Sequence, residues 1–557
     1  MISDHYYDHW PPNLPKHLTV PQTNIYYNVE VSATRFPKKT SIVFYDASIS
    51  YEELKNETER VAGFLQRSLG VKKGDRVILY MQNSPQWIIA FYGILRANAI
   101  VVPVNPMNIT DELRYYVQDS GAAVAFVAQD IYEQLEPLLR SGEIKHVIIA
   151  SYSDYLKRST DLQIPAFLSE ERRFINTKGV TLWHDVLESN FKPGKLTVGA
   201  DGLCLVIYTS GTTGRPRGCM HTHRSFMTTT VGTAQWCGHT QDAVFLSVLP
   251  FFHVTGLSGS MSGPIYVGAT IVLLSRWDRD AAAKIIEKHR VTVWQLISTM
   301  MVDFLSNPSV DKYDLSSLIC LRGGGAAMPD AIAKKLQELI GLTYLEGYGM
   351  SETISATHFN PPQRPKAQCL GIPIFDVDAR LIDPDTLNEI TDTNQIGELV
   401  IHTPQLMQGY WNNPQDTEEA FLRINDKTFI RTGDLVQVDD EGYFFIVDRL
   451  KRMINAAGYK VWPAEVEATM YRHPCILEVC VISTRDKRRG ETVKALVVLK
   501  DGCQGKVSEQ DIIDWTRNYL SAYKSPRVVQ FLKSLPKSNT GKIQWRKLQD
   551  EENNSVV

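Results

Sequence analysis

The residues best suited to chemistry form a run of glycines and hydroxyl side chains directly after an apolar segment. The run reads Tyr208-Thr209-Ser210-Gly211-Thr212-Thr213-Gly214-Arg215-Pro216-Arg217-Gly218. Glycines let a ligand approach the backbone closely, and free N–H groups, hydroxyls and arginines bind phosphate oxygens. No Gly-Lys-Ser/Thr sequence ends the run, so it is not a Walker P-loop. The pattern predicts a phosphate-binding loop, and the alternative is a flexible polar surface loop.

Two further motifs follow apolar segments and carry groups that suit a nucleotide. They read Gly323-Gly324-Gly325 and Gly347-Tyr348-Gly349-Met350-Ser351-Glu352. The first, taken alone, indicates a tight turn between a strand and a helix. In the second, the ring of Tyr348 suits stacking on adenine, and the hydroxyl of Ser351 suits the α-phosphate. Glu352 offers the oxygen ligand that Mg²⁺ prefers, although an acid at a helix N-terminus is the simpler alternative.

Four single residues toward the carboxyl end complete the candidate set. Asp434 follows an expected turn, and one carboxylate can accept hydrogen bonds from both ribose hydroxyls. A surface ion pair is the alternative for Asp434 and for Arg449. Gly458 would ordinarily be a turn residue, and Lys542 a solvated charge. These residues gain a functional interpretation from their place after the earlier motifs.

Alternating helical and strand patterns must position these groups. Helices are expected at residues 51–69, 85–95, 280–289 and 329–339, and strands at 76–80, 122–128, 203–208, 245–249, 270–274 and 291–297. Such alternation predicts an α/β architecture with parallel sheets covered by helices. Ligands in such folds bind in the loops beyond the carboxyl ends of the strands, where the motifs stand.

About the last hundred residues predict a separate small α+β unit. Strands are expected at residues 443–446, 476–482 and 492–499, and helices at 508–520 and from Pro463. The charged run at residues 448–452 is the candidate linker. We therefore predict a large domain over residues 1–448 and a small domain over residues 449–557.

Composition excludes several classes of protein. The net charge of -3 gives no general attraction to nucleic acid. The eight cysteines include no CxxC pair, which argues against a zinc ribbon and suggests a reducing, cytoplasmic setting. The most apolar segment, residues 87–102, contains Arg96 and is short for a membrane span. The N-terminus shows no secretory signal pattern.

In this order, the motifs resemble the signatures of the adenylate-forming superfamily, which includes acyl-CoA synthetases, luciferases and peptide-synthetase adenylation domains. The resemblance runs from about residue 41 to residue 542. It implies a large N-terminal domain with parallel sheets and a smaller β subdomain, followed by a small mobile C-terminal domain that pivots at Lys451. It also implies that the loop from Thr209 to Gly214 closes over the β- and γ-phosphates, with Arg217 where lysine is common.

The same resemblance implies roles for the remaining motif residues. The glycines at 323–325 would form a wall of the adenine and acyl sites, and Glu352 would bind magnesium. Asp434 and Arg449 would contact the ribose. Gly458 would border the pantetheine tunnel, and Lys542 would be the catalytic lysine.

The segment around His253 bears on which acid is the substrate. His253 itself would lie near the substrate carboxylate or be a core histidine. Gly256 and Gly259 on the following helix are expected to leave room for an acyl chain, and no charge interrupts residues 254–267. The resemblance is closest to bacterial medium- and long-chain fatty acid–CoA ligases. It implies ATP, Mg²⁺ and coenzyme A as cofactors, an acyl-AMP intermediate and a fatty acid substrate.

Several alternatives stay open at this point. The acid could be aryl or short-chain, and the acceptor a carrier protein. Luciferases usually carry lysine where Asn455 stands, and a serine hydrolase would need Gly-x-Ser-x-Gly, which Gly256-Leu257-Ser258-Gly259-Ser260 lacks. The basic run at residues 485–489 could meet CoA phosphates or a membrane surface, although a solvated loop is favoured. The sequence also leaves the oligomeric state open, a homodimer included.

Overall fold

The computed structural model describes residues 5–209, 215–325, 328–456, 459–486, 490–537 and 543–555. The chain forms two compact units. The larger unit comprises Tyr6–Asp378 and His402–Ile430, and the smaller unit comprises Met1–His5, Ala379–Ile401 and Arg431–Val557.

A nine-stranded sheet in the larger unit carries the two glycine motifs. Its order is β16-β15-β14-β13-β12-β10-β11-β1-β2, parallel from β14 to β1 and antiparallel at both edges. The strands are β1 (Thr40–Phe44), β2 (Ala47–Ser50), β10 (Val244–Ser247), β11 (Thr270–Leu273), β12 (Val293–Leu296), β13 (Cys320–Gly324), β14 (Tyr344–Met350), β15 (Ser355–Phe359) and β16 (Ile372–Pro373).

A seven-stranded sheet in the same unit leads into the hydroxyl-rich run. Its order is β7-β6-β5-β3-β4-β8-β9, and only the β8–β9 pair is antiparallel. The strands are β3 (Arg76–Tyr80), β4 (Ile100–Pro103), β5 (Val124–Ala128), β6 (His146–Ala150), β7 (Val180–Leu182), β8 (Leu203–Thr209) and β9 (Arg217–Thr222). The apolar runs seen in the sequence are these strands, and their side chains form one core with α4 and α5.

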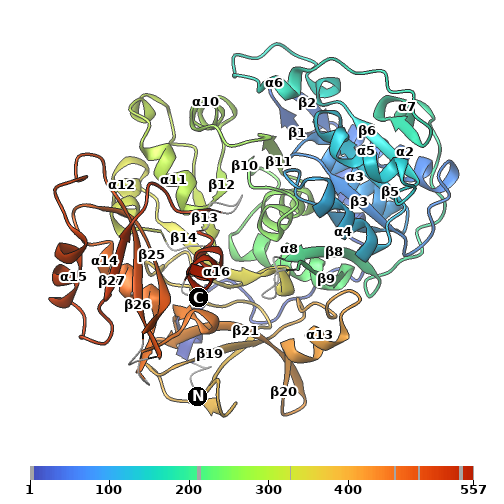
Figure 1. Ribbon diagram of the computed structural model, residues 1–557. Helices are drawn as coiled ribbons and strands as arrows, with labels where there is room; N and C mark the ends of the chain where they lie inside the picture. The colour runs from blue at the N-terminus through green and yellow to red at the C-terminus, as the bar shows by residue number, and fades with distance from the viewer. Residues whose placement is uncertain are drawn as a thin grey trace. The chain divides into compact units, whose positions relative to one another are not determined.

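Helices pack along both sheets (Figure 1). They are α1 (Tyr27–Arg35), α2 (Tyr51–Arg67), α3 (Pro85–Arg96), α4 (Thr110–Ser120), α5 (Tyr132–Arg140), α6 (Ala166–Ser169), α7 (Trp183–Glu188), α8 (His223–Trp236), α9 (Gly263–Val267), α10 (Arg279–His289), α11 (Ser298–Leu305), α12 (Asp330–Ile340) and α13 (Pro414–Ala420). Ser50 and Glu53 form a capping box that starts α2. The predicted α/β class is confirmed.

The apolar segment at residues 87–102 is the buried helix α3 running into β4, as the sequence predicted. Among the described residues, no helix is long and apolar enough to cross a membrane.

The smaller unit contains strands of two sheets. A six-stranded sheet comprises β17 (Asp378–Ile382), β18 (Glu389–Ile390), β19 (Ile396–His402), β20 (Phe421–Ile424), β21 (Lys427–Val438) and β22 (Phe444–Arg449), of which β20 and the start of β21 belong to the larger unit. A five-stranded sheet comprises β23 (Ile454–Ala456), β24 (Tyr459–Val461), β25 (Ile476–Asp486), β26 (Gly490–Leu499) and β27 (Val528–Phe531). The helices are α14 (Pro463–Met470), α15 (Glu509–Arg517) and α16 (Trp545–Ser555).

The five-stranded sheet and its helices have their own core, which confirms the expected small α+β fold. This compact unit also takes in Ala379–Ile401 and the chain from Arg431. A separate movement of residues 449–557 about Lys451 stays a prediction.

The cysteines differ from the sequence expectation at one place. Cys475 and Cys503 form a disulfide in the smaller unit, with Cα atoms 5.6 Å apart. The two residues are 28 positions apart, so no local spacing signalled the pair. The other six cysteines are free.

Candidate active site

Thr209 and Arg217 bracket the hydroxyl-rich run and are register partners where β8 and β9 pair. This places the run at the carboxyl edge of the seven-stranded sheet, as the sequence predicted. Ser210, Gly211, Thr212, Thr213 and Gly214 lie outside the described residues, so their binding to phosphate stays a prediction.

The two glycine motifs are brought together in the neighbouring sheet. Gly324 on β13 and Gly347 on β14 are register partners, and a Cβ at Gly324 would lie 2.2 Å from the carbonyl oxygen of Gly347. A Cβ at Gly323 would lie 1.8 Å from the carbonyl oxygen of Leu296, and one at Gly349 would lie 1.8 Å from that of Ser355. The close packing of the strands therefore requires these glycines, whatever ligand lies beyond them. Gly325 follows with a φ of +87°.

A turn after β14 carries Glu352, whose side chain is buried. The Tyr410 hydroxyl donates to Glu352 Oε1 at 2.8 Å, and burial beside this carboxylate raises the pKa of Tyr410 far above its ordinary value. Tyr410 therefore stays a hydrogen-bond donor and fixes the direction of the carboxylate.

The turn that carries Glu352 is also contacted by a histidine of β9. His221 Nε2 lies 2.7 Å from the carbonyl oxygen of Ser351, and burial lowers the pKa of His221 to about 4. The histidine is therefore neutral and donates through Nε2–H. This contact joins the Glu352 turn to the strand that follows the hydroxyl-rich run.

Arg217, expected to face phosphate, contacts protein in this structure. Its guanidinium lies 4.3 Å from the centroid of the Tyr410 ring and 3.3 Å from Asp416 Oδ2. The resulting chain of contacts runs from Asp416 through Arg217 and Tyr410 to Glu352. A direct phosphate contact of Arg217 stays a prediction.

Tyr410 and Asp416 were missed at the sequence level. Tyr410 stands in Gln408-Gly409-Tyr410-Trp411, which carries no charge. The segment pairs with β9, since Gln408 N–H donates to Met220 and Trp411 N–H donates to Gly218. Gly409 has a φ of +143°, which favours glycine, and this Gly-aromatic pattern was the only available signal.

On the adenylate-forming chemistry that the motif resemblance implies, replacing Tyr410 with phenylalanine is expected to slow adenylate formation about ten-fold, because the buried Glu352 carboxylate loses its donor. The half-saturating Mg²⁺ concentration should rise at the same time. Acid-dependent ATP–diphosphate exchange at several Mg²⁺ concentrations measures both effects. Tyr519→Phe, at a tyrosine 57% exposed, is the control. An unchanged Mg²⁺ dependence in Tyr410→Phe would refute the positioning role.

The Glu352 carboxylate could serve as a single protein ligand to Mg²⁺. One of its oxygens accepts from Tyr410, and a carboxylate has further lone pairs for a cation. Among the described residues, no group of three or more histidines, cysteines or acids could hold a metal. A single carboxylate is compatible with Mg²⁺, which keeps several waters and binds through one or two carboxylates and substrate phosphates.

Glu346 on β14 is a second buried acid that sequence reasoning missed. Its Oε1 accepts a hydrogen bond from the Met328 N–H at 2.8 Å. Met328 lies just before α12, so this bond holds the segment that leads into the helix. Burial raises the pKa of Glu346 to about 7, although backbone donors from Met328, Gln368 and Cys369 oppose the shift. The side chain therefore anchors the chain just after the first glycine motif.

Glu346→Gln is expected to flatten the dependence of stability on pH between about 4.5 and 7. In that window the folded protein holds the Glu346 proton and the unfolded chain releases it, so stability falls as pH rises, by about 3 kcal/mol in total. Glutamine can still accept from Met328 and cannot titrate. Thermal unfolding from pH 4.5 to 8 measures the difference between the two proteins. Parallel curves would contradict the assignment.

Tyr348 and His253 lie in less open positions than the sequence suggested. The Tyr348 ring is 9% exposed and packs edge-on against His358, at 5.8 Å between ring centroids. His253 is half-buried, and its Nδ1 accepts from the Thr255 N–H at 3.3 Å. Adenine stacking by Tyr348 and a carboxylate contact of His253 stay predictions.

The helix after His253 corrects one expectation. Gly256–Ser262 form a π-helical turn with every residue buried, and such turns are frequent at functional sites. A Cβ at Gly256 would lie 2.3 Å from the Pro250 carbonyl oxygen, and one at Gly259 would lie 1.9 Å from Gln295 Oε1. Neighbouring protein atoms therefore fill the space beside these two glycines, and that space is not free for an acyl chain.

The smaller unit brings two predicted residues together. Asp434 and Arg449 are register partners on β21 and β22, and Arg449 Nε lies 2.9 Å from Asp434 Oδ1. The two residues form an ion pair, but Asp434 is buried, unlike the surface pair that the sequence offered as the alternative. Ribose binding by either residue stays a prediction. Gly458 and Lys542 lie outside the described residues, as do residues 487–489 of the basic run.

Residues next to the expected pivot contact α14. Asp448 Oδ2 accepts from the Ala464 N–H at 2.7 Å, and Arg452 pairs with Glu467. A rotation at Lys451 would have to break the Asp448–Ala464 hydrogen bond.

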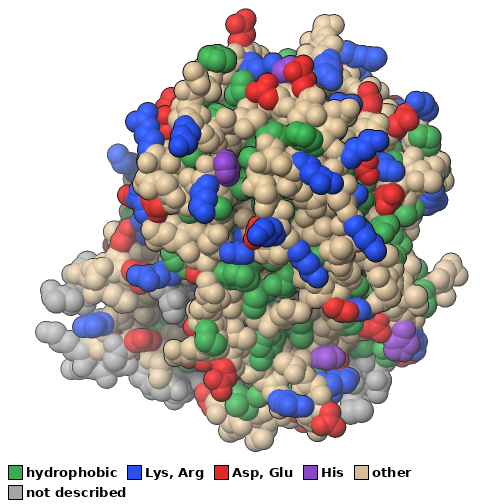
Figure 2. Space-filling model, turned by 90° about the vertical axis from the view of Figure 1, so that its right-hand side faces the viewer, with side chains coloured by type: hydrophobic (Ala, Val, Ile, Leu, Met, Phe, Trp, Pro, Cys, Tyr) green, Lys and Arg blue, Asp and Glu red, His purple; other side chains and the backbone are tan. Residues whose placement is uncertain are grey.

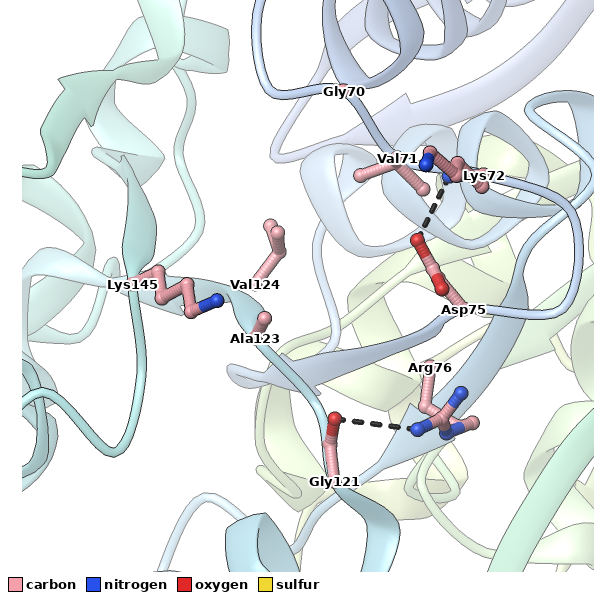
Figure 3. A pocket seen from close by; sticks show the side chains of 9 residues that line it. All are labelled: Gly70, Val71, Lys72, Asp75, Arg76, Gly121, Ala123, Val124 and Lys145. Carbon is pink, nitrogen blue, oxygen red and sulfur yellow. Dashed lines mark hydrogen bonds between the residues drawn. The ribbon is translucent and has the colours of Figure 1, made fainter.

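A pocket of about 310 Å³ lies away from these motifs (Figure 3). It is lined at the amino ends of β3 and β5 by residues including Asp75, Arg76 and Val124, and Lys145 extends beside it. The Arg76 guanidinium already donates to the carbonyl oxygens of Ser120 and Gly121. The hydroxyl-rich run stands at the opposite, carboxyl edge of the sheet, so the pocket is separate from the candidate active site.

On the face drawn in Figure 2, acidic and basic side chains are interspersed. This agrees with the small net charge.

Comparison with known proteins identifies relatives over nearly the whole chain. The profile described as AMP-binding enzyme matches residues 29–411, and that of the AMP-binding enzyme C-terminal domain matches residues 465–542. A long-chain-fatty-acid–CoA ligase of Bacillus subtilis (strain 168) is 34% identical over 554 residues, which cover 98% of this chain and 97% of the relative. A 4-coumarate–CoA ligase-like 2 protein of Arabidopsis thaliana is 32% identical over 528 residues, 92% of this chain and 88% of the relative.

Solved structures share the fold. The ATP-bound MatB from Rhodopseudomonas palustris superposes with a TM-score of 0.84 at 24% identity, over 96% of this chain and 100% of that protein.

Proposed function

This chain belongs to the AMP-binding enzyme family, and we propose that it joins a long-chain fatty acid to coenzyme A. It is an AMP-forming acid–thiol ligase. ATP and the acid give acyl-AMP and diphosphate, and CoA then takes the acyl group and releases AMP. The observation that carries the fatty acid assignment is 34% identity, over 98% of the chain, to a long-chain-fatty-acid–CoA ligase.

The first half-reaction needs alignment and charge neutralisation more than covalent help. The acid carboxylate attacks the α-phosphorus of ATP, and diphosphate leaves. We assign the hydroxyl-rich loop and Ser351 to the phosphates, and Glu352, oriented by Tyr410, to Mg²⁺. Mg²⁺ supplies positive charge to the phosphate oxygens. Lys542 adds a charge to the acid carboxylate and the α-phosphate.

The second half-reaction needs a thiol where the lysine was. An acyl-AMP anhydride has a good leaving group, and a thiolate displaces AMP from its carbonyl carbon. One arrangement cannot present both the lysine and the thiol, which is a physical reason for a mobile small domain. A pivot at Lys451 that exchanges Lys542 for Gly458 meets this need.

The acid is assigned as apolar. The segment expected to line the acyl site, residues 254–267, holds no charged residue of its own. Each buried methylene contributes about 0.8 kcal/mol to binding, so a long chain is favoured over a short one. An aryl acid is the second candidate, because the Arabidopsis relative is nearly as similar.

Acids of rising chain length, from butanoate to octadecanoate, together with 4-coumarate, test the assignment. CoA-dependent AMP release is measured for each. We expect kcat/KM to rise with chain length toward the long acids, by up to about 10-fold per two methylenes where the chain is buried. A maximum at 4-coumarate or butanoate would contradict the fatty acid assignment and leave the ligase reaction intact.

We place the reaction in the cytoplasm. Six cysteines are free and five of them are buried, which suits a reducing compartment. The Cys475–Cys503 disulfide would be reduced there, so thiol labelling of protein taken directly from cells tests this placement. Both of these cysteines should label.

A further inference from the structure

Arg322 on β13 is a buried cation without a carboxylate partner. Arg322 is 1% exposed, and its hydrogen-bond partners among the described residues are Cys237, Gly259 and Gln295, none of them an acid. One guanidinium nitrogen donates to the Gly259 carbonyl oxygen at 3.1 Å and to Gln295 Oε1 at 3.3 Å, and Nε has no partner. A buried charge is costly unless an opposite charge compensates it.

The group that can compensate Arg322 is the sulfur of Cys237. The other guanidinium nitrogen of Arg322 donates to Cys237 Sγ at 3.3 Å. Cys237 caps the carboxyl end of α8, and it is the one free cysteine of the described chain that is not buried. As a thiolate it would give Arg322 an anionic partner.

Two further groups surround this sulfur. The pKa of Cys237 lies well below the ordinary thiol value, because the Cys320 thiol, in the apolar cluster against which Cys237 packs, and the Arg322 and His239 side chains favour its thiolate and outweigh the effect of burial. Burial raises the pKa of Cys204 and Cys219, and it raises that of Cys480 to about 12. The direction of the pKa shift of Cys237 is thus opposite to that of Cys204, Cys219, Cys320 and Cys480.

We propose that Cys237 is a peroxide-reactive thiolate paired with Arg322, and that Cys320 is its resolving cysteine. The Cys237 thiolate attacks one oxygen of hydrogen peroxide, the O–O bond breaks, and hydroxide leaves and takes a proton from solvent. Cys237 is then a sulfenic acid. Cys320 loses its proton and attacks the Cys237 sulfur, an S–S bond forms, and the sulfenic oxygen leaves as water. The two thiols are oxidised by two electrons, and the peroxide is reduced by two.

Oxidation has a consequence for the residues that Arg322 holds. A disulfide removes the anion from Arg322, whose remaining contacts are Gly259 in the π-helical turn and Gln295 on β12. Gln295 in turn donates to the Thr255 carbonyl oxygen at 3.2 Å. On the proposed function these residues belong to the acyl side of the site, so the oxidised enzyme should bind its acid more weakly.

The chemistry can be tested without any activity assay. The whole protein is reduced, treated with a small excess of hydrogen peroxide at pH 7, and digested with trypsin without reductant. We expect mass spectrometry to find the peptide of residues 313–322, which carries Cys320, linked to the peptide that carries Cys237. At pH 7 a fully ionised cysteine has a thiolate fraction roughly 30-fold higher than that of an ordinary cysteine. Cys237 should therefore react well before Cys204 and Cys219.

Two conservative variants make the outcome decisive. In Cys320→Ala, the sulfenic acid cannot be resolved, and dimedone should label Cys237. In Cys237→Ser, Cys320 should stay unmodified. Cys237 that stays reduced in the wild-type protein, or that takes no dimedone in Cys320→Ala, would overturn the proposal, whether or not Cys475 and Cys503 become linked.

Activity gives a separate reading. Peroxide should raise the KM for the acid about two- to ten-fold in the wild-type enzyme, reversibly with dithiothreitol, and leave Cys237→Ser unchanged. A Cys237–Cys320 disulfide without a change in the KM for the acid would support the reactive cysteine pair. It would also show that oxidation of the pair does not affect acid binding. A protein inactive in every form but oxidised at Cys237 would refute the proposed function alone.

Discussion

Lys542→Ala is expected to remove acyl-adenylate formation and to spare thioester formation from supplied acyl-adenylate. The reason is that a positive charge on the acid carboxylate and α-phosphate matters only while that P–O bond forms. Loss of one such charge contact commonly costs a few kcal/mol of barrier, about 10²–10³ in rate. Acid-dependent ATP–diphosphate exchange measures the first half-reaction, and CoA thioester formed from synthetic acyl-AMP measures the second.

Lys537→Ala is the matched control, because it removes a lysine five positions away that pairs with Glu478 at the surface. Such a pair contributes little, so both half-reactions should be nearly unchanged. Equal loss of both half-reactions in Lys542→Ala would defeat the assignment of the lysine to the adenylation step.

Gly458→Trp should have the opposite pattern. If the glycine borders the path of the pantetheine thiol, a large side chain blocks that path and leaves the nucleotide site intact. Thioester formation is expected to fall by at least about 100-fold, the loss expected when a reacting group is kept about 1 Å from its position. ATP–diphosphate exchange, measured without CoA, should be retained.

Gly458→Ala supplies a graded control, since one methyl group obstructs less than an indole ring. Its thioester rate should lie between those of the wild type and Gly458→Trp. Loss of the exchange reaction in Gly458→Trp would show that the residue serves the adenylation step or the fold instead of the thiol path.

Local patterns in the sequence were enough to predict most of the fold. The apolar run at residues 76–80 is β3 with unchanged bounds, and the helix expected at 51–69 is α2 with a capping box at its start. Strand and helix periods are properties of neighbouring residues, so they are readable without knowledge of the fold. The order of the motifs similarly indicated the family, because each motif is short and contiguous.

Contacts between distant segments could not be predicted in the same way. Tyr410 contacts Glu352 across 58 positions, and Arg217 contacts Asp416 across 199. Nothing near Glu352 in the sequence indicates which donor will meet its carboxylate. Gly259 was interpreted as free space, and the structure fills that space with the side chain of Gln295, which comes from a later strand.

The boundary of the smaller unit is a further case. The charged run at residues 448–452 predicted a division there, and strands β17 to β19 and most of β21 lie earlier in the chain. Ala379–Ile401 and the chain from Arg431 nevertheless form one compact unit with the carboxyl end. Strand pairing over long separations determines that compact unit, and the domain boundary at residue 448 stays a prediction.

Transfer of carboxylate oxygen tests the central claim most directly. Purified enzyme is given ATP, Mg²⁺, CoA and hexadecanoate labelled with ¹⁸O in both carboxylate oxygens, and the AMP is examined by mass spectrometry. The acyl-adenylate route predicts one ¹⁸O atom in each AMP and none in diphosphate, because the acid oxygen that attacked the α-phosphorus leaves with AMP. Unlabelled AMP, or label in released phosphate, would contradict it.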